Sequence, residues 1–213
     1  MDSIKVFTLA PRENWICDRI AEEWYENTKA ISTRNIHESN IIWLLAGWCW
    51  NQIPRVILSN KKVVVTIHHI VPEKFTSQKL NDFIERDQFV NLYHVPNAKT
   101  LEQVSKLTNK PIKVLEYWFD SKKWYKSEKI DSRNILGLPE KDFIVGSFQR
   151  DTEGGDLITP KLEKGPDLFC DYVESMDKEN LHILLGGWRR QYVISRLEKA
   201  KMPYTYFELA DLD

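Results

Sequence analysis

The most informative pattern in this chain is GSFQRDTEGGDLITPKLEKGPDLF, residues 146–169. An apolar run that predicts a buried strand ends here, a polar loop follows, and Gly165 and Pro166 mark the predicted start of a helix. The free N–H groups and the dipole of such a helix start favour an anion. Arg150 and Lys164, at the two ends of the loop, would then bind one diphosphate. The alternative is two solvated basic side chains on an ordinary loop.

The composition is that of an ordinary globular protein. The chain has 213 residues, of which 42% are hydrophobic and 12% aromatic, enough for one large or two small cores. A net charge of -1 argues against nucleic acid as the main partner. The cysteines Cys17, Cys49 and Cys170 are widely spaced and form no C-x-x-C pair, so neither a disulfide framework nor a zinc site is predicted.

The sequence also predicts where the protein is found in the cell. No stretch approaches the roughly 18 uninterrupted apolar residues of a membrane-spanning helix, and the N-terminus lacks a signal-peptide pattern. Together with the cysteine usage, this predicts a cytoplasmic protein. Peripheral contact with a membrane stays open at this point.

Short apolar runs alternate with amphipathic segments along the first part of the chain. The runs predicted to be buried parallel strands are residues 4–10, 41–47, 63–67, 89–95 and 112–118. The predicted helices are Trp15 to Asn27, a short helix opened by Pro54, and residues 77–86 and 98–107. This alternation predicts a complete doubly wound, Rossmann-like α/β domain over residues 1–120, with ligands at the carboxyl ends of its strands.

A charged segment without periodicity, residues 121–141, predicts a linker to a second unit. That unit, residues 142–213, contains predicted strands at 143–149, 181–187 and 204–208 and predicted helices at 166–176 and 188–199. Three strands are few for a Rossmann-like domain and leave a sheet edge to be covered. We therefore expect an incomplete second domain, and self-association through it stays open.

From Leu136 onward the sequence resembles the donor-binding domain of GT-B glycosyltransferases, specifically the retaining family four (glycosyl transferases group 1). There a V-G-x-x-x-R strand end leads to a K-G-x-D-L helix start, then to a strand with a glycine turn. The matching residues are Gly146, Arg150, Lys164, Gly165, Asp167, Leu168, Gly186 and Gly187. The resemblance implies that Arg150 and Lys164 hold the diphosphate of a nucleotide-sugar, with Gly165 and Gly187 at the same binding site. The loop between them is longer than in relatives.

The predicted strand end VVVTIHH, residues 63–69, resembles the V-x-T-x-H motif of the family's N-terminal domain. Thr66 and His68 match the motif, and the resemblance implies that His68 faces the cleft between the domains, near the transferred sugar. Strand alternation allows only one of His68 and His69 to point there, and His68 is the candidate catalytic residue. The alternative is a structural histidine, hydrogen-bonded at a strand end.

Two segments depart from the family's pattern. In IKVLEYWFD, residues 112–120, Glu116, Tyr117 and Trp118 replace the usual Pro-Asn-Gly. Residues 10–15 replace the usual glycine-rich turn after the first strand. Asp120 still matches the family's pattern in the first of these segments, and the departure weakens the match at that turn. At residues 10–15, the loss of the glycines removes the support for backbone contact with a phosphate or an acceptor.

Three tryptophans lie close together near the end of the second predicted strand. Trp43, Trp48 and Trp50 would either stack an acceptor sugar or belong to the core, and clusters of this kind belong more often to the core.

No metal site is predicted. Asp211-Leu212-Asp213 is a D-x-D, the metal-binding signature of the other major glycosyltransferase fold, but two acids at a chain end arise readily by chance. Clustered carboxylates and histidines with ligand spacing are otherwise absent from the sequence.

The resemblance implies a retaining hexosyltransferase-type enzyme that needs no cofactor or metal. It would transfer a sugar from a nucleotide-diphosphate-sugar to a hydroxyl of a carbohydrate or glycolipid acceptor. The sequence ends before the family's E-x(7)-E motif, so we expect a truncated glycosyltransferase, weak or inactive alone. The alternative is a non-catalytic α/β nucleotide- or sugar-binding module. A dinucleotide-dependent oxidoreductase is disfavoured because no G-x-G-x-x-G follows the first strand.

Overall fold

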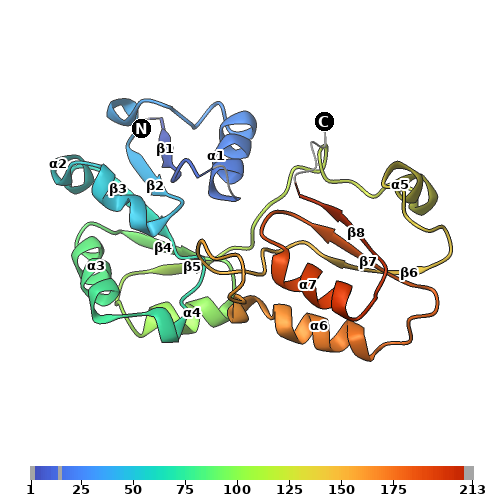
Figure 1. The fold of residues 1–213 in the computed structure, drawn as a ribbon. Helices are drawn as coiled ribbons and strands as arrows, with labels where there is room; N and C mark the ends of the chain where they lie inside the picture. The colour runs from blue at the N-terminus through green and yellow to red at the C-terminus, as the bar shows by residue number, and fades with distance from the viewer. Residues whose placement is uncertain (1–2, 14–15, 209–213) are drawn as a thin grey trace. The chain divides into compact units, whose positions relative to one another are not determined.

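The computed structural model describes residues 3–13 and 16–208, and the chain divides into two compact units, residues 1–125 and 126–213 (Figure 1). One unit contains a five-stranded sheet and the other a three-stranded sheet, both of them parallel. The predicted α/β fold class is therefore confirmed. Among the described residues, no helix is long and apolar enough to cross a membrane.

The sheet of the first unit follows the order of the sequence. Its strands are β1 (Val6–Leu9), β2 (Ile41–Leu44), β3 (Lys62–Thr66), β4 (Leu92–Val95) and β5 (Ile112–Val114), in the order β1-β2-β3-β4-β5. Each predicted run contains one strand, and four of the five strands are shorter than their runs, whereas β3 keeps the predicted length and begins one residue earlier, at Lys62. The remaining residues mostly lie in loops at the carboxyl edge of the sheet, where ligands bind in α/β folds.

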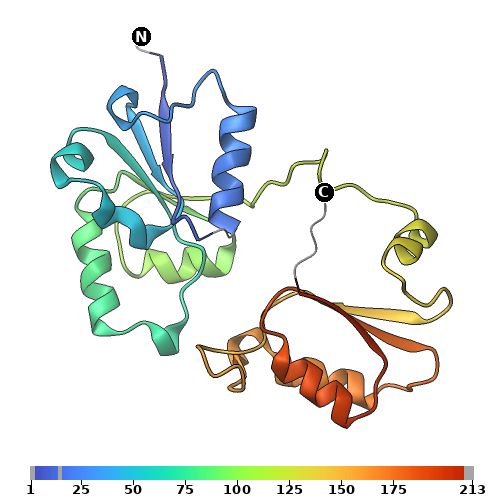
Figure 2. The same ribbon diagram turned by 45° about the horizontal axis from the view of Figure 1, so that its top comes forward.

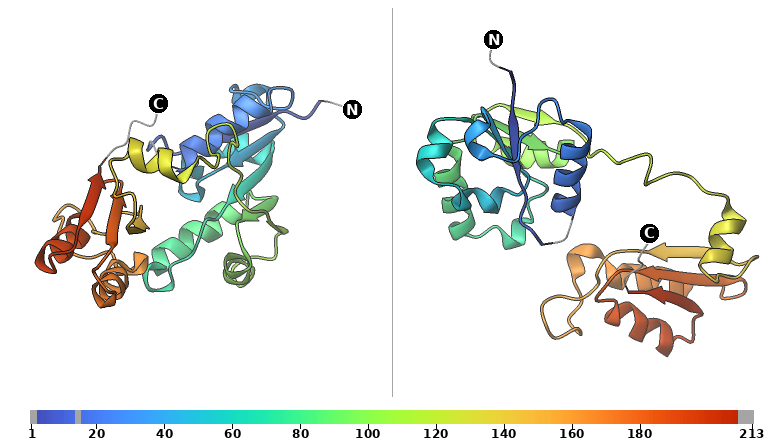
Figure 3. Two further views of the ribbon diagram at one scale, coloured as in Figure 1. Left: turned by 90° about the vertical axis from the view of Figure 1, so that its right-hand side faces the viewer. Right: turned by 90° about the horizontal axis from the view of Figure 1, so that it is seen from above.

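Helices cover both faces of this sheet, as the doubly wound prediction requires (Figure 3). The helices are α1 (Ile16–Asn27), α2 (Arg55–Ser59), α3 (Ser77–Asp87) and α4 (Ala98–Ser105). On one face, Ile20 of α1 packs in a buried cluster with Leu45. On the other face, the buried residues of α2, α3 and α4 pack against those of β2, β3 and β4. Trp15, the predicted first residue of α1, lies outside the described residues.

The path from α1 to β2 explains how α1 reaches its own face. After α1, Ser32 makes a parallel bridge to Val6, with the Val6 N–H donating to Ile31 O at 2.8 Å. The chain therefore touches β1 once before it crosses to β2. Right-handed crossovers on opposite sides of β1 place α1 and the later helices on opposite faces of the sheet.

The second unit contains six main elements. They are α5 (Lys129–Ile135), β6 (Phe143–Ser147), α6 (Pro166–Ser175), β7 (Leu181–Gly186), α7 (Gln191–Lys199) and β8 (Tyr204–Phe207), with sheet order β6-β7-β8. Figure 2 shows α6 and α7 side by side on one face of this sheet. Their apolar residues enclose Ile183 and Leu185 of β7, which are fully buried. The helix α5 lies inside the segment predicted to be a linker.

One buried arginine joins the carboxyl ends of β6 and β7. The Arg190 side chain is fully buried. Its Nη1 donates to Ser147 O at 3.0 Å and to Gly186 O at 3.2 Å, and also to Gln149 O. Its Nη2 donates to Ser147 Oγ at 2.7 Å. The guanidinium therefore fixes the loop that leaves β6 against the start of α7.

Asp151 is the counter-ion of this arginine. Its Oδ2 lies 3.4 Å from Arg190 Nε and accepts the Val193 N–H at 3.1 Å. Burial raises the pKa of Asp151 and lowers the pKa of Arg190, while each charge opposes the shift of the other. Two buried opposite charges stabilise a structure only as a pair, because either one alone is left in a low-dielectric interior.

We expect Arg190→Met to lower the free energy of unfolding of the second unit by about 3–5 kcal/mol, because the Asp151 carboxylate would be buried without its partner. The matched control is Arg196→Met on α7, whose ion pairs with Asp171 and Glu174 are partly exposed and should be worth about 1 kcal/mol or less. Native-state hydrogen exchange of the β7 amides measures both effects within one unit. Equal effects of the two substitutions would contradict the assignment.

Candidate functional site

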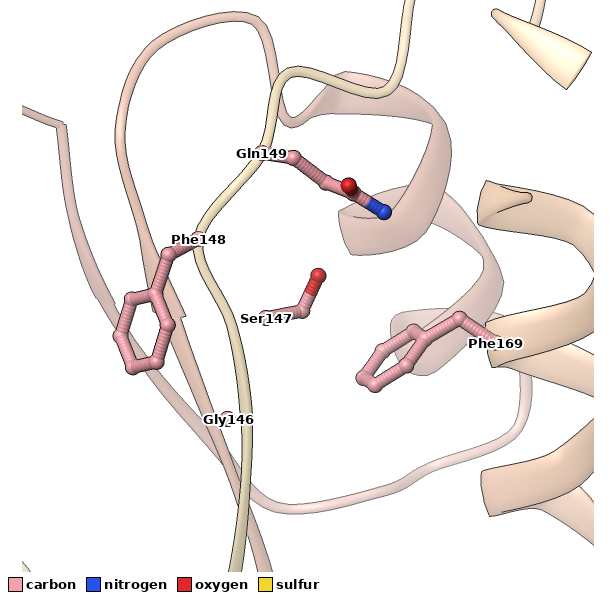
Figure 4. Close-up of a pocket in the computed structure, with 5 residues that line it drawn as sticks. All are labelled: Gly146, Ser147, Phe148, Gln149 and Phe169. Atoms are coloured by element: carbon pink, nitrogen blue, oxygen red, sulfur yellow. The ribbon is translucent and has the colours of Figure 1, made fainter. Parts of the chain in front are cut away.

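The second unit carries an open pocket at the carboxyl end of β6. It has a volume of about 470 Å³ and is lined by Gly146, Ser147, Phe148, Gln149 and Phe169 (Figure 4). Four of these residues belong to the strand end quoted at the start of the sequence analysis, and the fifth lies on α6. The pocket therefore lies where the predicted anion site begins.

The long polar loop after β6 folds back on itself. The Glu153 N–H donates to Thr159 O at 2.8 Å, and the Lys161 N–H donates to Asp151 O at 2.8 Å. At the base of the loop, Gln149 Nε2 donates to Lys164 O at 2.6 Å. Residues 151–161 therefore form a hairpin-like loop, and the chain returns to the end of β6, where it left the strand. The backbone segments that carry Arg150 and Lys164 are brought together despite the length of the loop.

Both cations are available to a ligand. The Arg150 side chain is half-buried and Lys164 is exposed. Within the part of the chain that the structure describes, neither side chain makes a hydrogen bond or an ion pair. An arginine and a lysine that make no ion pair with the protein can direct their N–H donors to an incoming anion.

The start of α6 offers backbone donors, although not at Gly165. Gly165 has φ 64° and ψ 39°, a left-handed conformation that glycine adopts without strain, and its N–H donates to Leu162 O at 2.9 Å. Pro166 has no N–H. For Asp167 and Leu168, no backbone acceptor lies within the described ranges, so these two N–H groups are the donors at the helix start. Gly165 contributes the turn that exposes them.

Asp167 adds a condition on the ligand. Its Oδ1 is buried and, among the described residues, has no hydrogen-bond donor. A buried acceptor without a donor costs free energy, and a ligand hydroxyl would remove that cost. The helix start therefore favours a ligand that combines an anionic group with hydroxyl groups over a simple anion.

The two glycines that match the family pattern in β6 and β7 make room for an aromatic ring. A Cβ atom at Gly146 would lie 2.7 Å from the Phe148 ring, and one at Gly186 would lie 2.8 Å from it. Phe148 is 68% exposed and points away from Phe169 (Figure 4). Gly187 has φ 89°, and its N–H donates to Phe207 O at 2.9 Å. Gly187 therefore lies in the turn between β7 and α7, where its N–H is paired with the end of β8 and is not a free donor.

In the first unit, His68 follows β3 and has protein partners at both ring nitrogens. Nε2 lies 2.7 Å from Leu45 O, and Nδ1 is hydrogen-bonded to the Tyr117 hydroxyl. A carbonyl oxygen can only accept, so Nε2 carries the proton and Nδ1 accepts from Tyr117. Thr100 Oγ1 of α4 donates to the His68 carbonyl at 3.4 Å, which holds the backbone of the turn.

Burial controls the protonation of His68, Tyr117 and Cys17, which lie close together near the strand ends. It lowers the pKa of His68, and the neighbouring His69 and His94 lower it further, while the hydrogen bond to Leu45 opposes the shift. His68 is therefore neutral at pH 7. Burial also raises the pKa of Tyr117 to about 12. Cys17 lies with its Sγ 3.3 Å from His68 Nε2, and its pKa is raised to about 11, so it is an inert thiol rather than a nucleophile.

Thr66, the other residue of the V-x-T-x-H match, has a structural role. Trp43 Nε1 donates to Thr66 Oγ1 at 2.9 Å, and Thr66 Oγ1 is 3.0 Å from His94 Nδ1. His94 Nε2 lies 2.7 Å from Leu115 O and must donate to it, so Nδ1 accepts the hydroxyl proton of Thr66. This chain of hydrogen bonds joins the ends of β2, β3, β4 and β5, and it engages the Thr66 hydroxyl with protein partners.

The residues that depart from the family pattern after β5 complete this part of the site. Tyr117 binds His68, as described above. Trp118 packs against Trp43, with ring centroids 5.8 Å apart, and against Trp24 at 6.3 Å. Sequence reasoning missed the role of Tyr117, because contact with a residue 49 positions away cannot be read from local spacing.

The tryptophans near β2 divide between core and surface. Trp50 is 3% exposed in the main core, with its Nε1 donating to Asp82 at 2.8 Å, and Trp43 is partly buried among aromatic rings. The core explanation therefore holds for both. Trp48 is 55% exposed, with its ring centroid 6.5 Å from that of His68. It is the member of the trio that a ligand can reach.

The described residues contain no group of three or more histidines, cysteines or acids placed to hold a metal ion. Asp211 and Asp213, which form the D-x-D, lie outside the described residues.

Comparisons with known proteins identify the fold. No protein-family model matches the chain, and no curated protein matches its sequence. The structure is similar to the crystal structure of Alr3699/HepE from Anabaena in complex with UDP and glucose. The TM-score is 0.67 at 11% sequence identity, over 96% of this chain and 69% of that chain. The chain therefore has the α/β fold of this protein over nearly its whole length.

Proposed function

We propose that this chain is a glycosyltransferase, or a part of one, that moves a sugar from a nucleotide-diphosphate-sugar to an acceptor hydroxyl with retention of configuration. The observation that supports the proposal is the return of the loop to its base, where Gln149 Nε2 donates to Lys164 O, so that the backbone next to Arg150 lies beside that of Lys164 at the start of α6. Within the described residues, neither cationic side chain has a protein partner. The fold supports the proposal, since the similar protein HepE was crystallised in complex with UDP and glucose. No metal or other cofactor enters this scheme.

The second unit would bind the donor. Negative charge grows on the diphosphate as the bond to the sugar breaks, and preorganised cations and N–H groups stabilise that charge without reorganisation. Arg150 and Lys164 supply the cations, and Asp167 and Leu168 supply the N–H groups. Gly165 and Gly187 shape the two turns beside them.

The affinity of these groups alone is limited. Micromolar binding requires about 8 kcal/mol, whereas each charge-assisted contact contributes roughly 1.5–3 kcal/mol before the cost of association. We therefore expect weak binding of a nucleotide-sugar by these 213 residues and weak or absent turnover without further contacts.

The first unit would hold the transferred sugar and the acceptor, with His68 as the residue facing the sugar. Its ring is neutral, and its Nδ1 accepts from Tyr117, so the Tyr117 oxygen keeps lone pairs for a substrate hydroxyl. We assign His68 the role of orienting this hydroxyl network rather than removing a proton by itself.

A second candidate is a non-catalytic nucleotide- or sugar-binding module. The full occupation of both His68 ring nitrogens by protein groups favours it. Incubation with radiolabelled UDP-glucose and saccharide acceptors separates the two candidates, because only a transferase moves label to the acceptor.

Arg150→Ala should weaken UDP binding by about tenfold or more, since a charge-assisted contact to phosphate is worth roughly 1.5–3 kcal/mol. Lys164→Ala should have a similar effect. Lys141→Ala is the matched control, because this exposed lysine lies before the amino end of β6, at the opposite end of the strand. NMR titration with UDP measures all three. Unchanged UDP affinity in Arg150→Ala would rule out the donor site.

Tyr117→Phe should raise the pKa of His68 toward its ordinary value. The Tyr117 hydroxyl donates to Nδ1 and so stabilises the neutral ring, and its loss favours the imidazolium. Titration of the His68 ring by NMR measures the shift, with Tyr125→Phe as the control because Tyr125 is 75% exposed. A pKa that stays the same or falls would show that Tyr117 does not bind Nδ1.

The lowered pKa of His68 also makes folding sensitive to pH. The unfolded chain binds a proton near pH 6.5, whereas the folded chain binds it only at lower pH. The contribution of His68 to stability is therefore present above pH 6.5 and is lost as the pH falls toward the folded pKa. Acid unfolding of the first unit should begin at lower pH in His68→Gln than in the wild type. An acid transition that does not move would contradict this.

A further inference from the structure

Trp48 presents an aromatic ring to solvent on a rigid support. It lies in the short 3-10 helix Gly47–Gln52, where its two neighbours in the sequence, Gly47 and Cys49, are buried and Trp48 is 55% exposed. Arg86 Nη1 donates to Gly47 O at 3.2 Å, and Trp50 anchors the helix in the core. An exposed ring on an immobilised backbone loses little conformational entropy when a ligand binds.

The surroundings of this ring are polar. His68 lies beside Trp48, and Tyr117, which is 38% exposed, follows with its ring centroid 5.6 Å from that of His68. Burial raises the pKa of both Cys17 and Cys49, and the carboxylates of Glu13 and Asp18 raise it further, so negative charge lies near the same strand ends. Trp48 is therefore one apolar ring among hydrogen-bonding groups.

This arrangement fits a pyranose ring. One face of a pyranose carries C–H groups that pack on an aromatic ring, while its hydroxyls project sideways to polar partners such as the Tyr117 oxygen. A fatty chain would cover the polar groups without replacing their hydrogen bonds.

The location agrees with a binding role. Trp48 follows β2, His68 follows β3 and Tyr117 follows β5, so the three side chains come from carboxyl ends of strands in one parallel sheet. Ligands of open α/β sheets bind along this edge.

We propose that Trp48 stacks the pyranose ring of a saccharide acceptor, with Tyr117 as a hydrogen-bonding partner of its hydroxyls. The inference rests on the proposed glycosyl transfer and names the acceptor class for it: a glycan rather than a lipid alcohol or a protein side chain.

The test uses the whole chain in the absence of any nucleotide-sugar. Saturation-transfer NMR measures the binding of methyl glucoside, methyl galactoside and methyl mannoside. Trp48→Ala should weaken the best of these ligands by about tenfold, and Trp48→Phe should weaken it less, since a smaller ring keeps part of the stacking. Trp124→Ala is the matched control, because Trp124 is 57% exposed and lies outside the Trp48, His68 and Tyr117 group. It should leave binding unchanged.

Three results would overturn the inference. They are equal binding by Trp48→Ala and the wild type, no binding of any of the three glycosides by the wild type, and tighter binding of hexanol than of the glycosides. The glycosides carry no phosphate, so their binding does not depend on Arg150 or Lys164. Intact UDP binding with no glycoside binding would refute the acceptor assignment alone. Intact glycoside binding with no UDP binding would refute the donor site and leave the saccharide site standing.

Discussion

The buried guanidinium of Arg190 is the constraint on which the second unit's candidate site depends. It donates to carbonyls at the ends of both β6 and β7, and its charge is balanced by Asp151, the residue directly after Arg150. Hydrogen bonds to a charged group are stronger than neutral ones, and in a buried site they permit little movement. The backbone next to Arg150 is therefore fixed, while the Arg150 side chain is free to meet an anion.

In the first unit, hydrogen bonds between neutral groups fix the strand ends beside the candidate site. His68, Tyr117 and Leu45 form one hydrogen-bonded set, and Thr66, His94 and Trp43 form another directly beneath the same strand ends. Every ring nitrogen in these sets has a partner, which fixes each tautomer. Polar atoms are thus satisfied by the protein itself, and the exposed groups beside these sets include the Trp48 ring and part of Tyr117.

Much of the architecture could be predicted from the sequence. Apolar runs rich in β-branched and aromatic residues indicate all eight described strands, because such side chains pack well on the pleated surface of a sheet. Gly165 before α6 and Pro166 as its first residue indicate the helix start for a local reason, since glycine adopts the left-handed turn without strain and proline is suited to the first helical position. Arg150, Lys164 and His68 were found through strand ends and a resemblance, and their roles remain proposals.

Only the tertiary structure decided which residues become hydrogen-bond or ion-pair partners when they lie far apart in the sequence. Charge density alone suggested a linker where α5 forms, because Arg133 satisfies the carbonyls of Pro139, Glu140 and Asp142 through contacts that leave no periodic pattern. The occupied N–H of Gly165, the pairing of Arg190 with Asp151 and the bond from Tyr117 to His68 likewise join residues whose spacing carries no signal. Local sequence determines backbone preference and burial, whereas hydrogen-bond partners depend on which strand ends the fold brings together.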